Sequence, residues 1–207
     1  KWLDTVTGKL PEFYGSIMTP IVAPLIDTNG DSVVNGADVP AVIFTAYLNR
    51  LVAVRGDTGQ VLFDIDTRQS VLVGHYDQLA VGDIDGDKLP EIIAVSENIG
   101  TPVLAFKNNG TLKWKSQSLS LQGSGAVNGG PSLADLDSDG TPEIIIGSTV
   151  LNANGSVRWQ GVESPRIGSN GNTCCLSIVA DIDLDGKPEI VGGNMAYRYD
   201  GKLMWDY

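Results

Sequence analysis

Residues 133–146 read LADLDSDGTPEIII, and two further stretches repeat this pattern, AVGDIDGDKLPEIIAV at residues 80–95 and VADIDLDGKPEIV at residues 179–191. Each copy has an apolar lead-in, Asp at alternating positions, a Pro-Glu pair and then Ile or Val. A looser fourth copy, IVAPLIDTNGDSVVNGADVPAVIF, occupies residues 21–44, with Pro40 in the place of the shared proline. Internal repetition indicates an architecture of stacked repeats, so these stretches set the register of the whole chain.

A second mark recurs downstream of each acidic stretch, where a turn signal precedes a short strand that ends in an aromatic residue. Asn-Gly and Asp-Gly pairs predict type I′ hairpin turns, in which both central residues have positive φ. The pairs and their aromatic residues are Asn109-Gly110 with Trp114, Asn154-Gly155 with Trp159, Asp200-Gly201 with Trp205 and, in the first copy, Asp57-Thr58-Gly59 with Phe63.

Each period reads as a strand, the acidic loop, a strand, a connection, a strand, a tight turn and a last strand. Four short antiparallel strands in about 40–50 residues are typical of a propeller blade, and no stretch shows sustained helical periodicity. We therefore predict an all-β, β-propeller-type array of four antiparallel blades. The blades are expected at approximately residues 3–66, 67–116, 117–160 and 161–207, within a single repeat domain at 1–207.

The composition narrows the classes of partner. The chain has 207 residues and a formal net charge of −11, which argues against nucleic acid because phosphate binding requires a basic surface. No apolar run approaches the roughly 18 residues of a membrane-spanning helix, so no membrane insertion is expected. Most of the acidic residues fall into the four repeated loops, which indicates that the charge supplies ligands for cations.

Three of these loops have the pattern of calcium sites. Alternating carboxylates converge on one point only if the backbone curls, and Gly86, Gly140 and Gly186 favour that curl. Ca²⁺ takes 6–8 oxygen ligands, whereas Mg²⁺ keeps its waters and avoids all-protein cages. A solvated Asp/Gly turn is the alternative for any single loop, but three loops in register favour metal. The predicted ligands at positions 1, 3, 5, 7 (a backbone carbonyl) and 9 are Asp83, Asp85, Asp87, Leu89 and Glu91; Asp135, Asp137, Asp139, Thr141 and Glu143; and Asp181, Asp183, Asp185, Lys187 and Glu189.

The first loop differs from the other three. It matches positions 1, 3, 5, 7, 9 and 12 of a twelve-residue EF-hand-type loop with Asp27, Asn29, Asp31, Val33, Asn35 and Asp38. It departs from that motif at position 6, which is Ser32, and at position 12, which is Asp and not Glu. Because a strand-like run follows, we interpret it as an enlarged blade loop in which Asp38 replaces the missing Glu. Three to four Ca²⁺ ions are therefore expected in all.

The D-x-D-x-D-G-x-P-E core followed by Ile or Val resembles the FG-GAP/VCBS repeat of the integrin α-subunit propeller and of many bacterial surface proteins. The resemblance covers essentially the whole chain and implies that a calcium loop joins the first and second strands of each blade. Because integrin-like propellers generally close with seven or eight blades, we expect these four to be part of a larger propeller. A four-blade ring, or two chains that complete one ring, are the alternatives.

Cys174 and Cys175 are the two cysteines of the chain. Neighbouring Cα atoms are about 3.8 Å apart, below the usual disulfide range of about 4.4–6.8 Å, so a bond between them would be a strained vicinal disulfide. We hypothesise that this bond forms, with free thiols or interchain bridges as the alternatives.

The function that these features favour is an extracellular or cell-surface scaffold, rigidified by calcium, for adhesion, recognition or self-assembly. Its partners would be a protein or glycan surface ligand, or a second copy bound through open blade edges. A lectin is one alternative, with stacking aromatics such as Tyr14, Tyr76, Tyr197 or Trp159. A polysaccharide lyase is another, with Arg166 or Lys187 as the base. The single histidine, His75, gives little support to an enzyme.

Overall fold

The structure is a computed structural model that describes residues 15–16, 18–74, 77–97, 102–119, 130–161, 176–192 and 195–206. It contains four antiparallel four-stranded sheets, each built from four consecutive strands, which confirms the predicted all-β array of blades. The strands of blade 1 are β1 (Ile21–Ala23), β2 (Ala41–Ala46), β3 (Arg50–Arg55) and β4 (Val61–Asp66); those of blade 2 are β5 (Ala80–Gly82), β6 (Glu91–Val95), β7 (Val103–Phe106) and β8 (Leu112–Lys115); those of blade 3 are β9 (Ser132–Ala134), β10 (Glu143–Ile146), β11 (Thr149–Leu151) and β12 (Val157–Gln160); and those of blade 4 are β13 (Ile178–Ala180), β14 (Glu189–Gly192), β15 (Met195–Arg198) and β16 (Leu203–Asp206).

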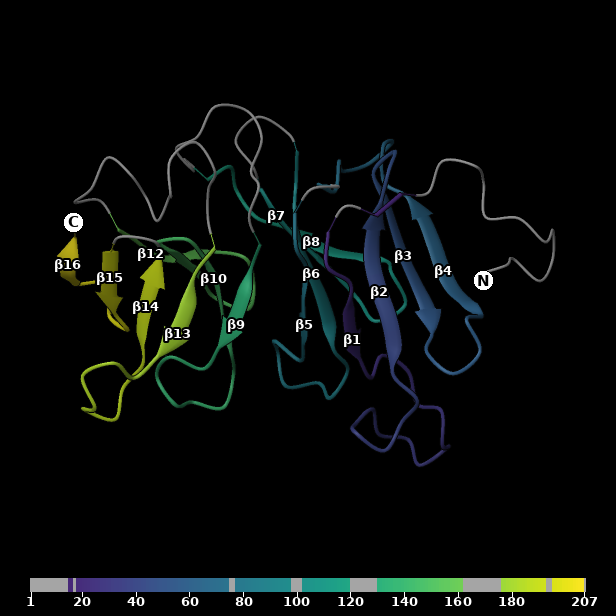
Figure 1. Ribbon diagram of the computed structural model, residues 1–207, viewed down its shortest axis with the longest axis horizontal. Helices are drawn as coiled ribbons and strands as arrows, with labels where there is room; N and C mark the ends of the chain where they lie inside the picture. Colours follow the sequence, from purple (N-terminus) through teal and green to yellow (C-terminus); the bar gives the residue numbers. More distant parts are fainter. Residues whose placement is uncertain are drawn as a thin grey trace.

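The four blades stand side by side in chain order (Figure 1). The first strand of each blade contacts the first strand of the next, so β1, β5, β9 and β13 form one continuous row through the array. Among the described strands, those of blade 1 make no contact with those of blade 4, so these four blades do not close into a ring. Within the same described residues there is no helix long and apolar enough to cross a membrane.

The core lies between blades. One buried cluster joins blades 1 and 2, a second joins blades 2 and 3, and a third joins blades 3 and 4. Every residue of β6 and of β10 is buried because a neighbouring blade covers each face. This two-sided burial explains why these strands have continuous Ile/Val runs in place of an alternating apolar and polar pattern.

The exposure of the residue that follows the first Asp of each acidic loop depends on whether a further blade packs against it. Ile84 is 0% exposed in the cluster between blades 2 and 3, and Leu136 is 1% exposed in the cluster between blades 3 and 4. Ile182, the corresponding residue of blade 4, is 42% exposed. The difference follows from position, because no further blade among the described residues covers the outer face of blade 4.

The hairpin turns differ from the predicted type I′ form, and that prediction is wrong. In blade 2 the Lys107 carbonyl accepts the Gly110 N–H at 2.8 Å, and the Lys107 N–H donates to Thr111 at 2.8 Å. Only the glycine of the Asn-Gly pair has positive φ, and the ladder shifts register between Ala105 and Phe106. In blades 2, 3 and 4 one additional residue therefore enters the loop, which makes a three-residue hairpin with glycine in the left-handed position. The turn of blade 1 has four residues, because the Arg55 carbonyl accepts the Gly59 N–H at 2.8 Å.

The glycines of these turns are covered by the aromatic side chains of the preceding blade. A Cβ at Gly155 would lie 2.8 Å from Trp114, and one at Gly201 would lie 2.8 Å from Trp159. The Trp159 indole N–H also donates to the Tyr199 carbonyl in the turn of blade 4, at 3.1 Å. The two repeated marks of the sequence, turn and aromatic residue, thus form one contact between successive blades.

Substitution of Ile84 by Ala should lower the free energy of unfolding by about 2–5 kcal/mol, because it leaves a cavity between two blades. Ile182→Ala makes the same chemical change at a half-exposed site and should cost less than about 1 kcal/mol. Urea denaturation of both variants in one calcium-containing buffer measures the difference. Equal losses for the two variants would show that the core does not lie between the blades.

Candidate functional site

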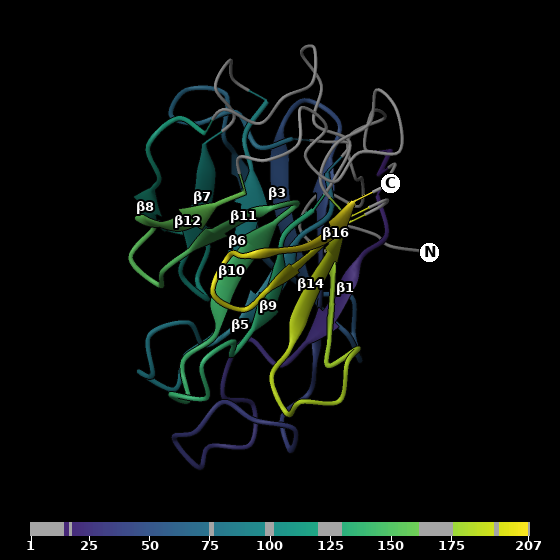
Figure 2. The same cartoon turned by 90° about the vertical axis from the view of Figure 1, so that its left-hand side faces the viewer.

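The four acidic loops lie along the same edge of the array, the lower edge in Figures 1 and 2. Each loop joins the first strand of its blade to the second, as the FG-GAP/VCBS resemblance implied. This placement follows from the antiparallel pairing, because every first strand runs toward this edge and every second strand begins there.

The first Asp of each loop holds the curl of the backbone. Asp83 accepts the N–H of Gly86 at 2.7 Å and of Lys88 at 2.8 Å, and Asp27 accepts the equivalent pair from Gly30 and Ser32. Two residues of every loop, three and five positions after this Asp, have positive φ, and glycine fills one of the two. The other is Ser32, Lys88, Ser138 or Leu184, all at φ between 62° and 69°.

The last acid of three loops is a buried glutamate at the start of the second strand. Glu91, Glu143 and Glu189 are 1%, 5% and 0% exposed. The Oε2 atom of each accepts the N–H of the residue after the first Asp, at distances of 2.9–3.2 Å. Burial raises the pKa of the Glu91 and Glu143 carboxyls above the usual range, although hydrogen bonds oppose the shift. The loop backbone thus fixes one oxygen of each glutamate and leaves the other toward the loop.

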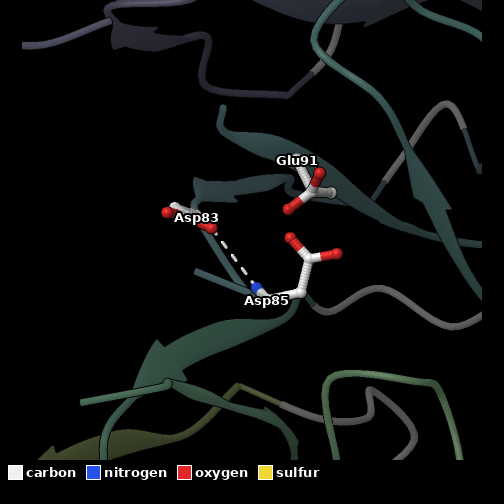
Figure 3. A group of neighbouring side chains, drawn as sticks. All are labelled: Asp83, Asp85 and Glu91. Atoms are coloured by element: carbon white, nitrogen blue, oxygen red, sulfur yellow. Dashed lines mark hydrogen bonds between the residues drawn. The ribbon is translucent and has the colours of Figure 1, made fainter. Parts of the chain in front are cut away.

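Three predicted ligands meet in each of these loops. One carboxylate oxygen each from positions 1, 3 and 9 lies within 4.8 Å of the others, and in blade 2 these residues are Asp83, Asp85 and Glu91 (Figure 3). The corresponding clusters are Asp135, Asp137 and Glu143 in blade 3, and Asp181, Asp183 and Glu189 in blade 4.

The position-5 residues, Asp87, Asp139 and Asp185, lie outside these clusters. Each accepts the N–H of the residue at position 7, at 2.7–2.9 Å, and so shapes the loop. Leu89, Thr141 and Lys187 are those position-7 residues. Their predicted role as carbonyl ligands stays a prediction.

The first loop does not bring three carboxylates together in this way. Asp38 is buried and accepts the Thr28 N–H at 2.7 Å and the Asn35 N–H at 2.9 Å. These backbone hydrogen bonds lower the pKa of the Asp38 carboxyl. Because Thr28 follows the first Asp, Asp38 binds the same backbone N–H that the glutamates bind in the other loops, although it precedes the second strand. The remaining members, Asn29, Asp31, Val33 and Asn35, make hydrogen bonds within the loop.

A basic side chain also reaches each three-carboxylate cluster, which the sequence did not lead us to expect. Lys113 on β8 lies with its Nζ 2.8 Å from Glu91 Oε1 and also contacts Asp85. Arg158 on β12 contacts Glu143 and lies 2.6 Å from Asp137. Arg198 on β15 lies 3.0 Å from Asp183. The period-two alternation of each strand predicts the side of the sheet that such a residue faces, but not the loop that it reaches.

These clusters fit a hard divalent cation. Each provides carboxylate oxygens, the donor type that Ca²⁺ prefers, on a loop whose curl is already formed. In blade 4, Glu189 Oε1 is buried and has no hydrogen-bond partner among the described residues. A buried carboxylate oxygen without a partner is costly, and a cation within the cluster would satisfy it.

Other candidates from the sequence have different outcomes. Tyr197 is buried rather than exposed and packs against Trp159 with ring centroids 5.9 Å apart, so it offers no sugar-stacking surface. Lys187 donates to the Tyr199 hydroxyl at 3.0 Å. Cys174, Cys175, Tyr14, Tyr76, His75 and Arg166 lie outside the described residues.

Residues 83–146, from the first Asp of the blade 2 loop to the end of β10, match the model of the FG-GAP-like repeat. Residues 83–146 are an FG-GAP-like repeat. This repeat contains the acidic loops of blades 2 and 3, and the recognition of the family from the sequence is confirmed. No curated protein sequence matches the chain.

Solved structures share the fold. The V. cholerae biofilm matrix protein Bap1 matches with a TM-score of 0.74 and 24% identity over 99% of this chain and 32% of that chain. A rhamnogalacturonan lyase from Bacillus licheniformis matches with a TM-score of 0.51 and 18% identity over 76% of this chain and 30% of its own. The rhamnogalacturonan lyase YesW matches with a TM-score of 0.52 and 19% identity over 81% of this chain and 29% of its own. The present chain therefore spans about a third of the length of the solved chains that it matches.

The buried glutamates have a structural role that can be separated from metal binding. In a buffer with chelator, Glu143→Ala should lower the free energy of unfolding by about 1–3 kcal/mol, because the Leu136 N–H loses its acceptor. Glu143→Gln keeps an oxygen for this hydrogen bond and should cost less. Urea denaturation followed by circular dichroism tests both variants. If the two variants lose equal stability, the charge of Glu143 and not its hydrogen bond holds the loop.

Proposed function

We propose that this chain is a calcium-binding repeat scaffold that works outside the cell, in adhesion, recognition or assembly. The observation that carries the proposal is the three-fold recurrence of one cluster, Asp-Asp-Glu, on one edge of three successive blades. Chance would not repeat the same three positions, the same buried glutamate and the same curl. The acidic net charge and the FG-GAP-like repeat support the same conclusion.

Calcium in such a cluster would connect the loop to the sheet. In blade 3, Asp135 and Asp137 lie on the loop, whereas Glu143 begins β10. An ion shared by the three carboxylates therefore fixes the loop to the buried second strand. At a free calcium concentration of about 100 times the Kd, each site would add roughly 2.7 kcal/mol to the free energy of unfolding. Extracellular calcium modules bind in the range of about 10⁻⁴–10⁻³ M, which suits millimolar surroundings.

Two considerations support the extracellular setting. The three carboxylates within each cluster repel one another, and an abundant divalent cation would relieve this repulsion more fully than the single basic side chain that reaches each cluster. The fold match to a biofilm matrix protein, which has a higher TM-score than the two lyase matches, agrees with a scaffold more than with an enzyme. Among the described residues, the lectin and lyase alternatives have no comparable support, since Tyr197 is buried and Lys187 donates to the Tyr199 hydroxyl.

Isothermal titration of the chelator-treated chain with CaCl₂ should give at least three bound ions, one for each of the three clusters. The melting temperature in millimolar calcium should exceed that in EDTA by several degrees, because ions that bind the native state stabilise it. Magnesium at the same concentration should give a smaller shift.

A ligand variant provides the matched control. Asp83→Asn should remove one ion and leave the clusters of blades 3 and 4 able to bind, because each cluster is built within its own blade. If the wild-type chain binds no calcium and melts at the same temperature in calcium and in EDTA, the acidic loops are turns and nothing more.

We also propose that the open outer face of blade 4 takes part in assembly with a second copy of the chain. Ile178 on β13 is 71% exposed there, near the half-exposed Ile182. Sedimentation velocity at rising protein concentration should show association, and Ile178→Asp should weaken it because a charge would have to be buried. A wild-type chain that stays monomeric at high concentration would contradict this proposal.

A further inference from the structure

The basic side chains at the three clusters occupy equivalent places, although they come from different strands. Lys113 and Arg158 directly precede the tryptophans of β8 and β12. In β16 the residue before the tryptophan is Met204, and the cation of blade 4 comes instead from Arg198 on β15. The neutral Met204 shows that a long apolar side chain is compatible with this place in a blade.

Each cation lies between the position-3 Asp and the position-9 Glu of its own loop. Lys113 contacts Asp85 and lies 2.8 Å from Glu91 Oε1. The Arg158 guanidinium spans Asp137, at 2.6 Å, and Glu143. These carboxylates are two of the three that would hold an ion, so the basic group lies in the region that the ion requires.

The contact between the basic side chain and the glutamate becomes looser from blades 2 and 3 to blade 4. In blades 2 and 3 the Oε1 atom of the glutamate is in direct contact with its basic partner. In blade 4, Arg198 Nη1 is 4.0 Å from Glu189 Oε1, too far for a hydrogen bond, and that fully buried oxygen has no hydrogen-bond partner among the described residues. The exposed side-chain fraction of the cation rises in the same order, from 18% for Lys113 to 29% for Arg158 and 37% for Arg198.

We propose that Lys113, Arg158 and Arg198 are tethered competitors of the metal ion, and that they rank the three clusters so that blade 4 binds calcium most tightly. The inference rests on the proposed calcium function. An ion lies about 2.3–2.6 Å from each ligand oxygen, so it cannot share the space between the two carboxylates with a bound ammonium or guanidinium group. Entry of the ion must break the ion pair and turn the long side chain out to solvent, which the open loop edge allows. The strength of the ion pair thus subtracts from the affinity of the site.

The test uses a chain in which one cluster is left. Glu143→Gln and Glu189→Gln together leave the blade 2 cluster, and calcium affinity is then measured by isothermal titration with and without Lys113→Met. We expect Lys113→Met to tighten the Kd about tenfold, the effect of losing one charge-assisted hydrogen bond. Lys115→Met is the matched control, because Lys115 lies two residues away on the same strand and is exposed. It removes the same charge and should change the Kd less than twofold, since solvent and salt screen an exposed charge.

Blade 4 provides the corresponding comparison. With Glu91→Gln and Glu143→Gln in place, the remaining cluster should have a lower Kd than the blade 2 cluster alone. Arg198→Met should tighten it less than threefold, because Arg198 pairs closely with one proposed ligand, Asp183 at 3.0 Å, and lies 4.0 Å from Glu189.

Nitrogen NMR of the arginine side chains tests the same idea in the wild-type chain and does not depend on how the variants fold. The Arg158 guanidinium signals should show restricted rotation in chelator and free rotation in saturating calcium. Guanidinium signals that do not respond to calcium, or a Lys113→Met Kd no tighter than that of Lys115→Met, would overturn the competition while calcium binding stands. No calcium binding by the wild type or by either methionine variant would overturn the calcium function itself, and this inference with it.

Discussion

Each sheet of this chain has two apolar faces, and neither can be buried within the sheet itself. The buried strands β6 and β10 need a neighbouring blade on both sides, and the three main core clusters each join two blades. Stability is therefore a sum over the junctions between blades, as in other repeat proteins. The loops on the edge contribute one apolar residue to this packing where a further blade follows, Ile84 or Leu136, and their remaining positions face away from the core. This arrangement allows them to carry a high density of charge.

The sequence predicted the features that follow from periodicity. The repeat specified four blades, and the alternating acids specified which side chains would share a loop, since the same spacing of acids recurs before a shared proline. The glutamate that ends each motif was predicted as a ligand, but its second role was not. A bond such as that from the Ile84 N–H to Glu91 arises only when the loop folds back on the strand that follows it.

Other features could not be read from local patterns. The turn prediction failed at Asn109-Gly110 because a two-residue signal does not state how many residues enter the loop, and the ladder register decides that. The sequence suggests Tyr197 as an exposed stacking residue, whereas the packing of blade 4 against Trp159 buries it. Lys113 is 22 residues from Glu91 in sequence, and only the pairing of three strands brings them together. Long-range contacts of this kind depend on the whole sheet.

The contact between aromatic residue and turn runs in one direction along the chain. Phe63 covers Gly110 of blade 2, Trp114 covers Gly155 of blade 3, and Trp159 covers Gly201 of blade 4, so at each of these three junctions the earlier blade donates a ring to the turn of the later one. Such a junction is heterologous, because its two surfaces differ. Repetition of a heterologous contact closes into a ring when the rotation per unit divides the circle, and otherwise continues as a helix. Copies that join through the ends of this array, using this same contact, must therefore meet head to tail, and a two-fold symmetric dimer cannot reproduce it.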